Sequence, residues 1–213
     1  MWEKLSLPWQ AALEMAWEAY CDDCVPIGAV TTDAEGKILS RGRNRIYSAR
    51  SEDGRRRGKT LAHAEIEALN QVDYEAFDPH TGILYTTTEP CPMCLGTFYM
   101  SGFRTVHYAS RDPYAGSLDL LGKTPYLRRK HIRVFEPFDP LLEIVLMALY
   151  IEYEVVIGHN HIRKTDLYPI WQQVEPRGVA FGEALAQAGE LRGRRDNFSA
   201  PQAFDWLLGK LVD

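Results

Sequence analysis

The chain has 213 residues, enough for one sizeable domain or for one domain with an appendage. Its 46% hydrophobic and 25% charged residues are ordinary for a soluble globular protein. The formal net charge of −5 argues against a dominant nucleic-acid-binding surface, but it leaves room for a local basic patch.

The sequence shows neither a signal peptide nor a membrane-spanning stretch, and this bears on the expected cellular location. The first ten residues lack the apolar core of a signal peptide, and the longest apolar stretch, 141–157, contains three glutamates. We therefore expect a cytoplasmic protein that does not enter a membrane. Its four cysteines are then better explained as thiols or metal ligands than as disulfides.

The first two thirds of the chain alternate between helical and strand patterns. Apolar spacing predicts a helix over 9–20, and the runs 26–32 and 38–43 predict a hairpin that turns at 33–37. The polar stretch 44–60 lacks periodicity and predicts a long loop. Helices over 61–71 and 91–101 and strands over 82–88, 105–110 and 132–135 complete the pattern. This order predicts an α/β fold with a mixed sheet between helices, because a hairpin joins the first strands and crossover helices join later ones.

The pattern changes after Pro140. Residues 141–156 predict one long buried helix, and a less regular stretch follows it. Further helices are predicted over 179–191 and from Ser199 onward, where a serine cap and an early proline are start signals. We therefore expect a domain of residues 1–157 and a C-terminal helical extension, 158–213, packed on it.

Two short motifs point to a catalytic metal site. His63-Ala64-Glu65 opens one predicted helix, and Cys91 and Cys94, directly after Pro90, open another. One imidazole and two thiols are suitable zinc ligands, and a set of three leaves the fourth position to water, as in catalytic zinc sites. Glu65 lies about 200° around an ideal helix from His63. It therefore suits a general acid/base better than a fourth ligand.

Other residues could in principle bind metal. Cys21 and Cys24 form a second C-x-x-C, so a four-cysteine zinc site is the rival interpretation. The two pairs are much farther apart than in ordinary zinc ribbons, and His63 would then have no role. The His159-Asn160-His161 run lacks an evident third ligand, and His107 is expected to be a structural histidine in a strand.

Several basic runs are candidates for phosphate contacts. Residues 55–59 are the first candidate, 128–130 another, and Arg192, Arg194 and Arg195 a third. Runs of charge are more often solvated surface, and the chain has more acidic than basic residues.

The chain resembles the cytidine-deaminase superfamily, above all the branch that contains bacterial tRNA adenosine deaminase and guanine deaminase. The stretches that show the resemblance are 25–30, 42–45, 62–66, 84–96 and 110–116. The resemblance implies a three-layer α/β/α sandwich with a five-stranded sheet, assembly as a homodimer, and hydrolytic deamination with zinc held by His63, Cys91 and Cys94. Glu65 matches the acid/base of the zinc-deaminase signature.

The resemblance also suggests which residues contact the substrate. By position, Asn44 matches an asparagine that hydrogen-bonds the base, and Ala64 contributes a backbone contact to the base edge. Glu89 and Pro90, next to the first cysteine ligand, are further substrate-binding candidates. The chain departs from the branch in the long basic stretch between Asn44 and His63 and in its C-terminal extension, so the substrate stays open.

The sequence leads to three ranked functions. The first is a zinc-dependent hydrolytic deaminase of a nucleobase or nucleoside, with purine slightly ahead of pyrimidine. The second is adenosine-to-inosine editing of tRNA. The third, from a different class, is a zinc-stabilised scaffold without catalysis.

Overall fold

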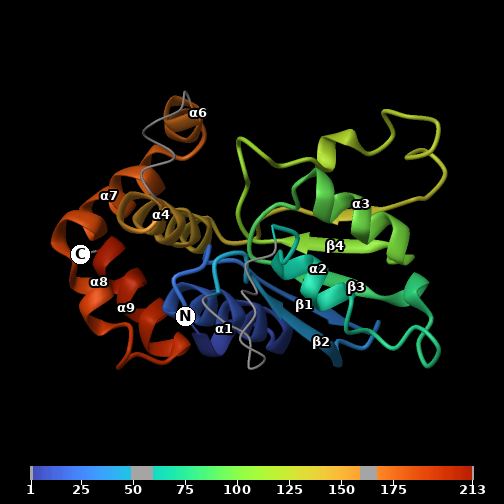
Figure 1. Ribbon diagram of the computed structural model, residues 1–213, viewed down its shortest axis with the longest axis horizontal. Coiled ribbons are helices and arrows are strands. Elements are labelled where there is room, and N and C mark those ends of the chain that lie inside the picture. The colour runs from blue at the N-terminus through green and yellow to red at the C-terminus, as the bar shows by residue number, and fades with distance from the viewer. Residues whose placement is uncertain (1, 49–59, 159–166, 213) are drawn as a thin grey trace.

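The computed structural model describes residues 2–48, 60–158 and 167–212 (Figure 1). Its centre is a five-stranded sheet with the order β2-β1-β3-β4-β5. The strands are β1 (Gly28–Thr32), β2 (Ile38–Arg43), β3 (Ile83–Thr86), β4 (Thr105–Tyr108) and β5 (Arg133–Phe135). β1 pairs antiparallel with β2 and β3, whereas β3, β4 and β5 are parallel to one another. The predicted mixed sheet is confirmed.

Helices cover both faces of this sheet. α1 (Leu7–Cys21) packs on β1 and β2 from one side, and α2 (Ala64–Leu69) packs on the same strands from the other, beside α3 (Pro92–Ser101). Two glycines permit this close approach, because a Cβ at Gly28 would lie 2.1 Å from the Ala12 carbonyl oxygen, and one at Gly42 2.2 Å from that of Ala64. The three-layer arrangement is therefore confirmed, and the start of α2 is held tightly against the sheet. Short 3-10 turns lie at Trp2–Lys4, Pro79–Thr81 and Leu118–Leu120.

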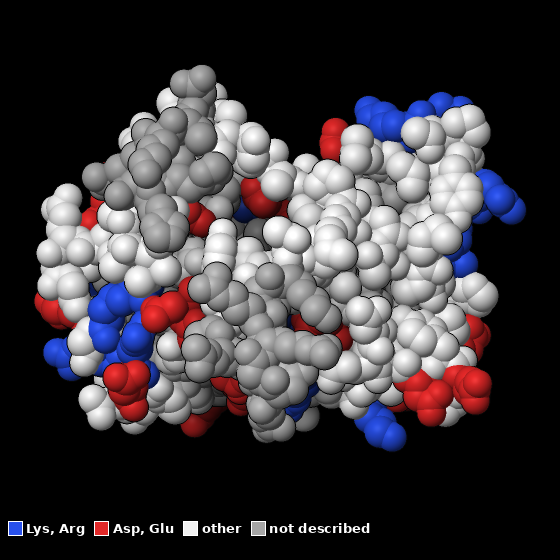
Figure 2. Space-filling view, viewed as in Figure 1, with Lys and Arg blue, Asp and Glu red and all other residues white. Residues whose placement is uncertain are grey.

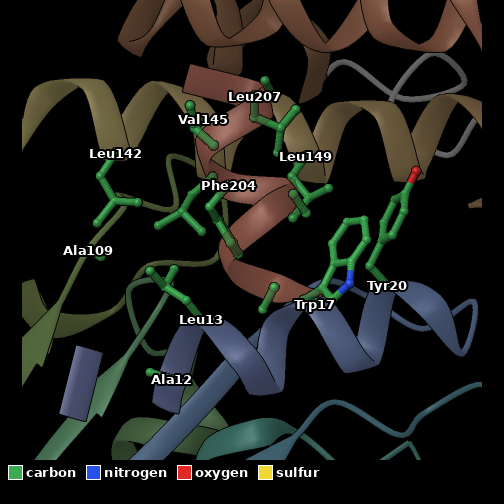
Figure 3. Packing of buried hydrophobic residues seen from close by; sticks show 14 of the residues in the cluster. Ala12, Leu13, Trp17, Tyr20, Ala109, Leu142, Val145, Leu149, Phe204 and Leu207 are labelled. Carbon is green, nitrogen blue, oxygen red and sulfur yellow. The ribbon is translucent and has the colours of Figure 1, made fainter. Parts of the chain in front are cut away.

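The C-terminal third forms a helical layer against α1. Its elements are α4 (Pro140–Val156), α6 (Leu167–Val174), α7 (Pro176–Ala188), α8 (Glu190–Arg194) and α9 (Ala200–Val212). Figure 3 shows Phe204 and Leu207 of α9 meeting Val145 of α4 and Leu13 of α1 in one hydrophobic cluster. The extension thus shares a core with the first helix. None of the helices in the described ranges is long and apolar enough to cross a bilayer.

The structure differs from the sequence prediction at α2, α6, α7 and α8. The helix expected over 61–71 spans only Ala64–Leu69, because His63 is extended and the Arg45 amide binds the Ala62 carbonyl. α6 and α8 were not predicted. α7 begins at Pro176, where the Glu175 side chain caps the Arg177 amide, and ends before Gly189 in a left-handed conformation.

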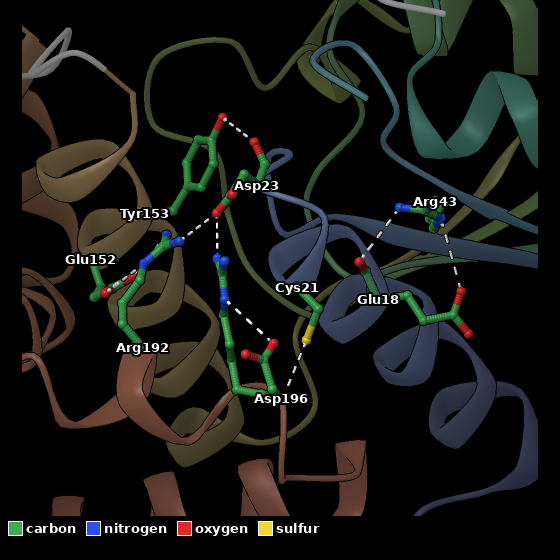
Figure 4. Close-up of polar contacts among 9 residues, drawn as sticks. Glu18, Cys21, Asp23, Arg43, Glu152, Tyr153, Arg192 and Asp196 are labelled. Atoms are coloured by element: carbon green, nitrogen blue, oxygen red, sulfur yellow. Dashed lines mark hydrogen bonds and ion pairs between the residues drawn. The ribbon is translucent and has the colours of Figure 1, made fainter. Parts of the chain in front are cut away.

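A buried charge network joins the extension to the first helix (Figure 4). The Arg192 guanidinium binds the Glu152 carboxylate at 3.2 Å and that of Asp23 at 2.7 Å. The Glu152 side chain is fully buried and that of Arg192 is 15% exposed. Arg195 also binds Asp23. These contacts hold α8 against α4 and the end of α1.

Removing Arg192 should therefore destabilise the whole fold. Arg192→Met leaves Glu152 buried without a counter-charge, and we expect a loss of about 3–5 kcal/mol in the free energy of unfolding, measured in urea. Lys210→Met, which breaks the half-exposed pair with Glu190, is the matched control and should cost about 0–1 kcal/mol. Equal losses in the two variants would contradict this account.

Candidate metal centre and active site

Two helices that begin beside each other bring the predicted ligands together. His63 is the residue before α2 and Cys91 the residue before α3, and both have extended backbones. Neither side chain caps its own helix, so each is free to turn toward the neighbouring helix start. Cys94 follows in the first turn of α3 and is fully buried.

The distances among the three side chains fit a tetrahedral zinc ion. The Nδ1 atom of His63 lies 3.7 Å from Sγ of Cys91 and 3.5 Å from Sγ of Cys94, and all three ligand atoms lie within 4.8 Å of one another. Zn–S and Zn–N bonds of ordinary length place neighbouring tetrahedral ligands about 3.5–3.8 Å apart. The donor set, two thiols and an imidazole, is also one that zinc prefers.

Glu65 lies against this cluster although it leaves α2 in a different direction from His63. Its Oε2 atom accepts a hydrogen bond from the Cys94 thiol at 3.2 Å, and its Oε1 atom accepts one from the Thr86 hydroxyl at 3.2 Å. The residue is only 3% exposed, and this burial raises the pKa of its carboxyl. A carboxyl of this kind can hold and release a proton within reach of the ligands.

The helix starts favour anionic sulfur. Hydrogen bonds from the Cys94 thiol and the His63 ring lower the pKa of Cys91 to about 4. The partial positive charge at the two helix N-termini acts in the same direction. The pKa of the Cys94 thiol is instead raised, by its hydrogen bond with Cys91, by burial and by the nearby Glu65. Negative charge at this point of the fold is therefore favoured on Cys91.

Asn44 and Ala64 lie next to the cluster. Asn44 follows β2 and is buried, with its Oδ1 atom accepting a hydrogen bond from the Ile46 amide. The neighbouring Arg45 amide pairs with Ala62, so this segment runs alongside the residues that lead into His63. Ala64 lies between His63 and Glu65 and is buried. Their substrate contacts stay predictions.

Glu89 and Pro90 hold the loop that follows β4. The Glu89 carboxylate accepts a hydrogen bond from the Leu118 amide at 3.2 Å, and the Pro90 carbonyl accepts one from the Ser117 hydroxyl at 2.7 Å. These bonds fix residues 110–118 beside the cysteine ligands. A direct substrate contact for either residue stays a prediction.

The structure adds two residues that the sequence reasoning missed. Thr86, at the end of β3, orients the Glu65 carboxyl. Asp112 is half-buried, and its Oδ1 atom accepts hydrogen bonds from the Tyr114 and Ala115 amides. Burial raises the pKa of its carboxyl, and the nearby Cys91 thiolate raises it further. Its position before Pro113 marks a turn in the sequence, but that signal gives no indication that the carboxyl lies near Cys91.

The other candidate residues lie apart from this cluster. Cys21 contacts the Arg195 carbonyl and Cys24 the Ser48 hydroxyl, and within the described residues only His63, Cys91 and Cys94 assemble as a metal-binding group. The four-cysteine interpretation is therefore not supported. His107 stacks between Tyr85 and Phe135, as expected for a structural histidine. The runs 55–59 and 159–161 lie outside the described residues.

Comparison with known proteins bears on the same segment. Residues 3–110, half of the chain, match the family described as the cytidine and deoxycytidylate deaminase zinc-binding region. The chain belongs to this family. The metal cluster is thus the zinc-binding region of a deaminase-like domain, and His63, Cys91 and Cys94 are positioned to hold the ion.

Relatives named for different activities share this domain. A tRNA(Ile)-lysidine synthase of Deinococcus radiodurans is 36% identical over 109 residues, which are 50% of this chain but only 17% of that protein. A tRNA-specific adenosine deaminase of Agrobacterium fabrum is 33% identical over 52% of this chain and 68% of its own length. A guanine deaminase of Bacillus subtilis is 34% identical over 40% and 50%, respectively.

Solved structures agree with the fold. A structure from a study of tRNA:A34 deaminases has a TM-score of 0.51 and 28% identity, covering 61% of this chain and 95% of that one. A structure with bound 8-azaguanine has a TM-score of 0.51 and 26% identity, covering 67% and 80%. The expected resemblance to this branch is confirmed.

The ligand assignment can be tested with two equivalent cysteines. Cys94→Ser removes one of three ligands, and we expect the purified protein to lose its zinc, measured by elemental mass spectrometry. Cys24→Ser changes the second cysteine of the other C-x-x-C, which is equally buried, and should retain one zinc per chain. Loss of zinc from the Cys24 variant alone would reverse the assignment.

Proposed function

We propose that this chain is a zinc-dependent hydrolytic deaminase that releases ammonia from a nucleobase or nucleoside, with purine slightly favoured. The observation that supports this most directly is the buried Glu65 carboxyl, which lies 3.2 Å from a ligand sulfur and is not needed as a ligand. A proton carrier beside three ligands is the arrangement that hydrolytic metal chemistry requires.

The proposed chemistry divides between the metal and the chain. A zinc ion held by His63, Cys91 and Cys94 would lower the pKa of a water molecule toward neutrality. Glu65 accepts the proton that this water loses as its oxygen bonds to the ring carbon. Glu65 delivers that proton to the adjacent ring nitrogen. It then takes the second proton from the newly bonded oxygen and passes it to the amino group, whose bond to carbon breaks as ammonia leaves and the carbon–oxygen bond becomes a double bond. Thr86 holds the carboxyl in one orientation throughout.

Removing the Glu65 carboxyl should separate metal binding from turnover. We expect Glu65→Ala to keep its zinc and to lose activity by about two to four orders of magnitude, because proton transfer contributes a factor of this size. Ammonia release is measured with whichever base, nucleoside, nucleotide or tRNA the wild-type protein deaminates in a screen. Near-normal turnover in a zinc-replete variant would eliminate the proposed role.

The preference for purine rests on the relatives. A guanine deaminase is among them, and one solved structure holds 8-azaguanine, although two relatives are named as cytosine deaminases. The alternative substrate is adenosine in tRNA, which the names of other relatives support. A salt titration of tRNA binding distinguishes the two, because phosphate contacts give a steep salt dependence and a free-base enzyme gives none. A non-catalytic zinc scaffold is the remaining alternative, and it would release no ammonia from any member of the screen.

We also propose a homodimer in the cytoplasm, formed through the groove between α2 and α3. The groove has a volume of about 580 Å³ and is lined mainly by apolar side chains, including Met93 and Met100. Met100, one of these side chains, is 67% exposed. A second copy would cover it.

A charge in this groove should prevent the pairing. We expect wild-type protein to be dimeric and Met100→Glu to be monomeric by size-exclusion chromatography with light scattering. Val212→Glu, at an equally exposed apolar residue far along the chain, is the control and should remain dimeric. A monomeric wild-type protein would rule out the proposal.

A further inference from the structure

A second pocket lies at the opposite end of α3 from the metal ligands. It has a volume of about 300 Å³ and is lined by Tyr99, Arg104, Tyr126, Arg129 and Lys130. Tyr99 comes from the last turns of α3, Arg104 from the segment before β4, and the other three from the segment before β5. The Tyr99 hydroxyl binds the Tyr126 carbonyl at 2.6 Å and the Lys130 amide at 3.1 Å, so the wall is built from three segments tied together.

Positive charge accumulates at this pocket without acidic partners. Among the residues that the structure describes, Arg104, Arg129 and Lys130 form no ion pair, and neither does the adjacent Arg128. Figure 2 shows basic side chains gathered along the upper right edge, over the segment that precedes β5 in Figure 1. In a chain with a net charge of −5, such a cluster is not explained by overall composition.

The negative C-terminal end of α3 can neutralise only part of this positive charge. Lys130 donates to the Tyr99 carbonyl in the last turn of α3, and Arg104 donates to the carbonyls of Gly102 and Phe103 just beyond it. That end is equivalent to about half of one negative charge. The full positive charges of Lys130 and Arg104 already exceed this partial negative charge.

Arg129 carries a positive charge that no neighbouring group neutralises among the residues the structure describes. Within the described ranges its guanidinium has no hydrogen-bond partner and lies 5.9 Å from the centre of the Tyr126 ring. Partial burial and the positive charges of Arg104 and Arg129 lower the pKa of the Lys130 amine. The three cations therefore repel one another around a cavity that an anion would relieve.

We propose that this pocket binds a phosphate group. Guanidinium groups match the oxygen atoms of phosphate in pairs, and the Lys130 ammonium adds a point charge. The half-exposed Tyr126 ring offers a flat face for a sugar or base attached to that phosphate. No residue of the metal cluster takes part in the pocket.

The length of α3 limits which phosphate can bind here. The helix has ten residues and is about 15 Å long, with the metal ligands at its beginning and the basic pocket at its end. A phosphate carried on the same nucleoside as the reacting base cannot reach across that distance. The group therefore belongs either to a second phosphorylated molecule or to a distant nucleotide of an RNA substrate.

The test compares a variant that loses one positive charge but keeps the contacts at the end of α3 with a variant that loses both. Arg129→Gln removes a cation that does not cap α3, and Arg104→Gln/Arg129→Gln removes two. Binding of inorganic phosphate, a purine mononucleotide and a short single-stranded RNA is measured by calorimetry and fluorescence anisotropy on zinc-loaded protein. Arg177→Gln, an exposed arginine of α7, is the control. Because no turnover is measured, an inactive deaminase would leave the proposal standing.

We expect Arg129→Gln to weaken phosphate binding by roughly tenfold, as for one lost charge-assisted hydrogen bond, and the control to change nothing. Binding of RNA in preference to the mononucleotide, with a salt slope reduced by about 0.7 in Arg129→Gln, identifies an RNA backbone. Tighter binding of the mononucleotide identifies a separate phosphorylated ligand. Unchanged affinity for all three probes in the double variant, with or without a loss of stability, would overturn the proposal and leave only a helix cap.

Discussion

The meeting of two helix N-termini is the constraint on which the rest of the site depends. α2 and α3 begin side by side, and their partial positive charges would repel if nothing lay between them. The side chains that fill this point are two thiols, an imidazole and a buried carboxyl. Hydrogen bonds from its neighbours and the positive helix ends favour negative charge on the Cys91 sulfur, whereas the hydrogen bond with Cys91 and burial raise the pKa of Cys94. Zinc then becomes the cation of an already anionic group, and the close packing of α2 on Gly42 fixes where that group can form.

Two of the three ligands, His63 and Cys91, directly precede a helix, and Cys94 lies in a first turn. This is why the sequence predicted the ligand cluster better than the helix boundaries. The H-x-E and P-C-x-x-C motifs identified His63, Glu65, Cys91 and Cys94 because each motif marks a helix start. Periodicity alone predicted that α2 begins at residue 61. In the structure His63 is extended and precedes the helix, and this conformation turns its ring toward the cysteines. Thr86 was missed because its contact with Glu65 depends on strand pairing. Asp112 was missed because its direction depends on how a loop folds.

The mixed character of the sheet was easier to predict than the C-terminal region for a related reason. Hairpins and crossovers leave local signals, so the mixed sheet followed from turns and spacing. The extension depends on contacts between distant segments. α6 and α8 are short, and α8 is held by Arg192 binding Glu152 and Asp23, which lie 40 and 169 residues away in sequence. A five-residue helix gains little from its own hydrogen bonds, so tertiary contacts determine it.

The charge at the two ends of α3 links the metal centre and the basic pocket. The positive end favours thiolates, and the negative end draws Lys130 and Arg104 onto its carbonyls. Both clusters are therefore oriented by the same short helix, which is too rigid to change their separation. The end that binds metal can satisfy its charge within the chain, because sulfur and carboxylate lie there. More positive charge lies at the C-terminal end of α3 than the helix can neutralise, and the charge of Arg129 stays unbalanced. A ligand that carries its own negative charge completes that end, and the fixed length of the helix determines how far this ligand lies from the reacting base.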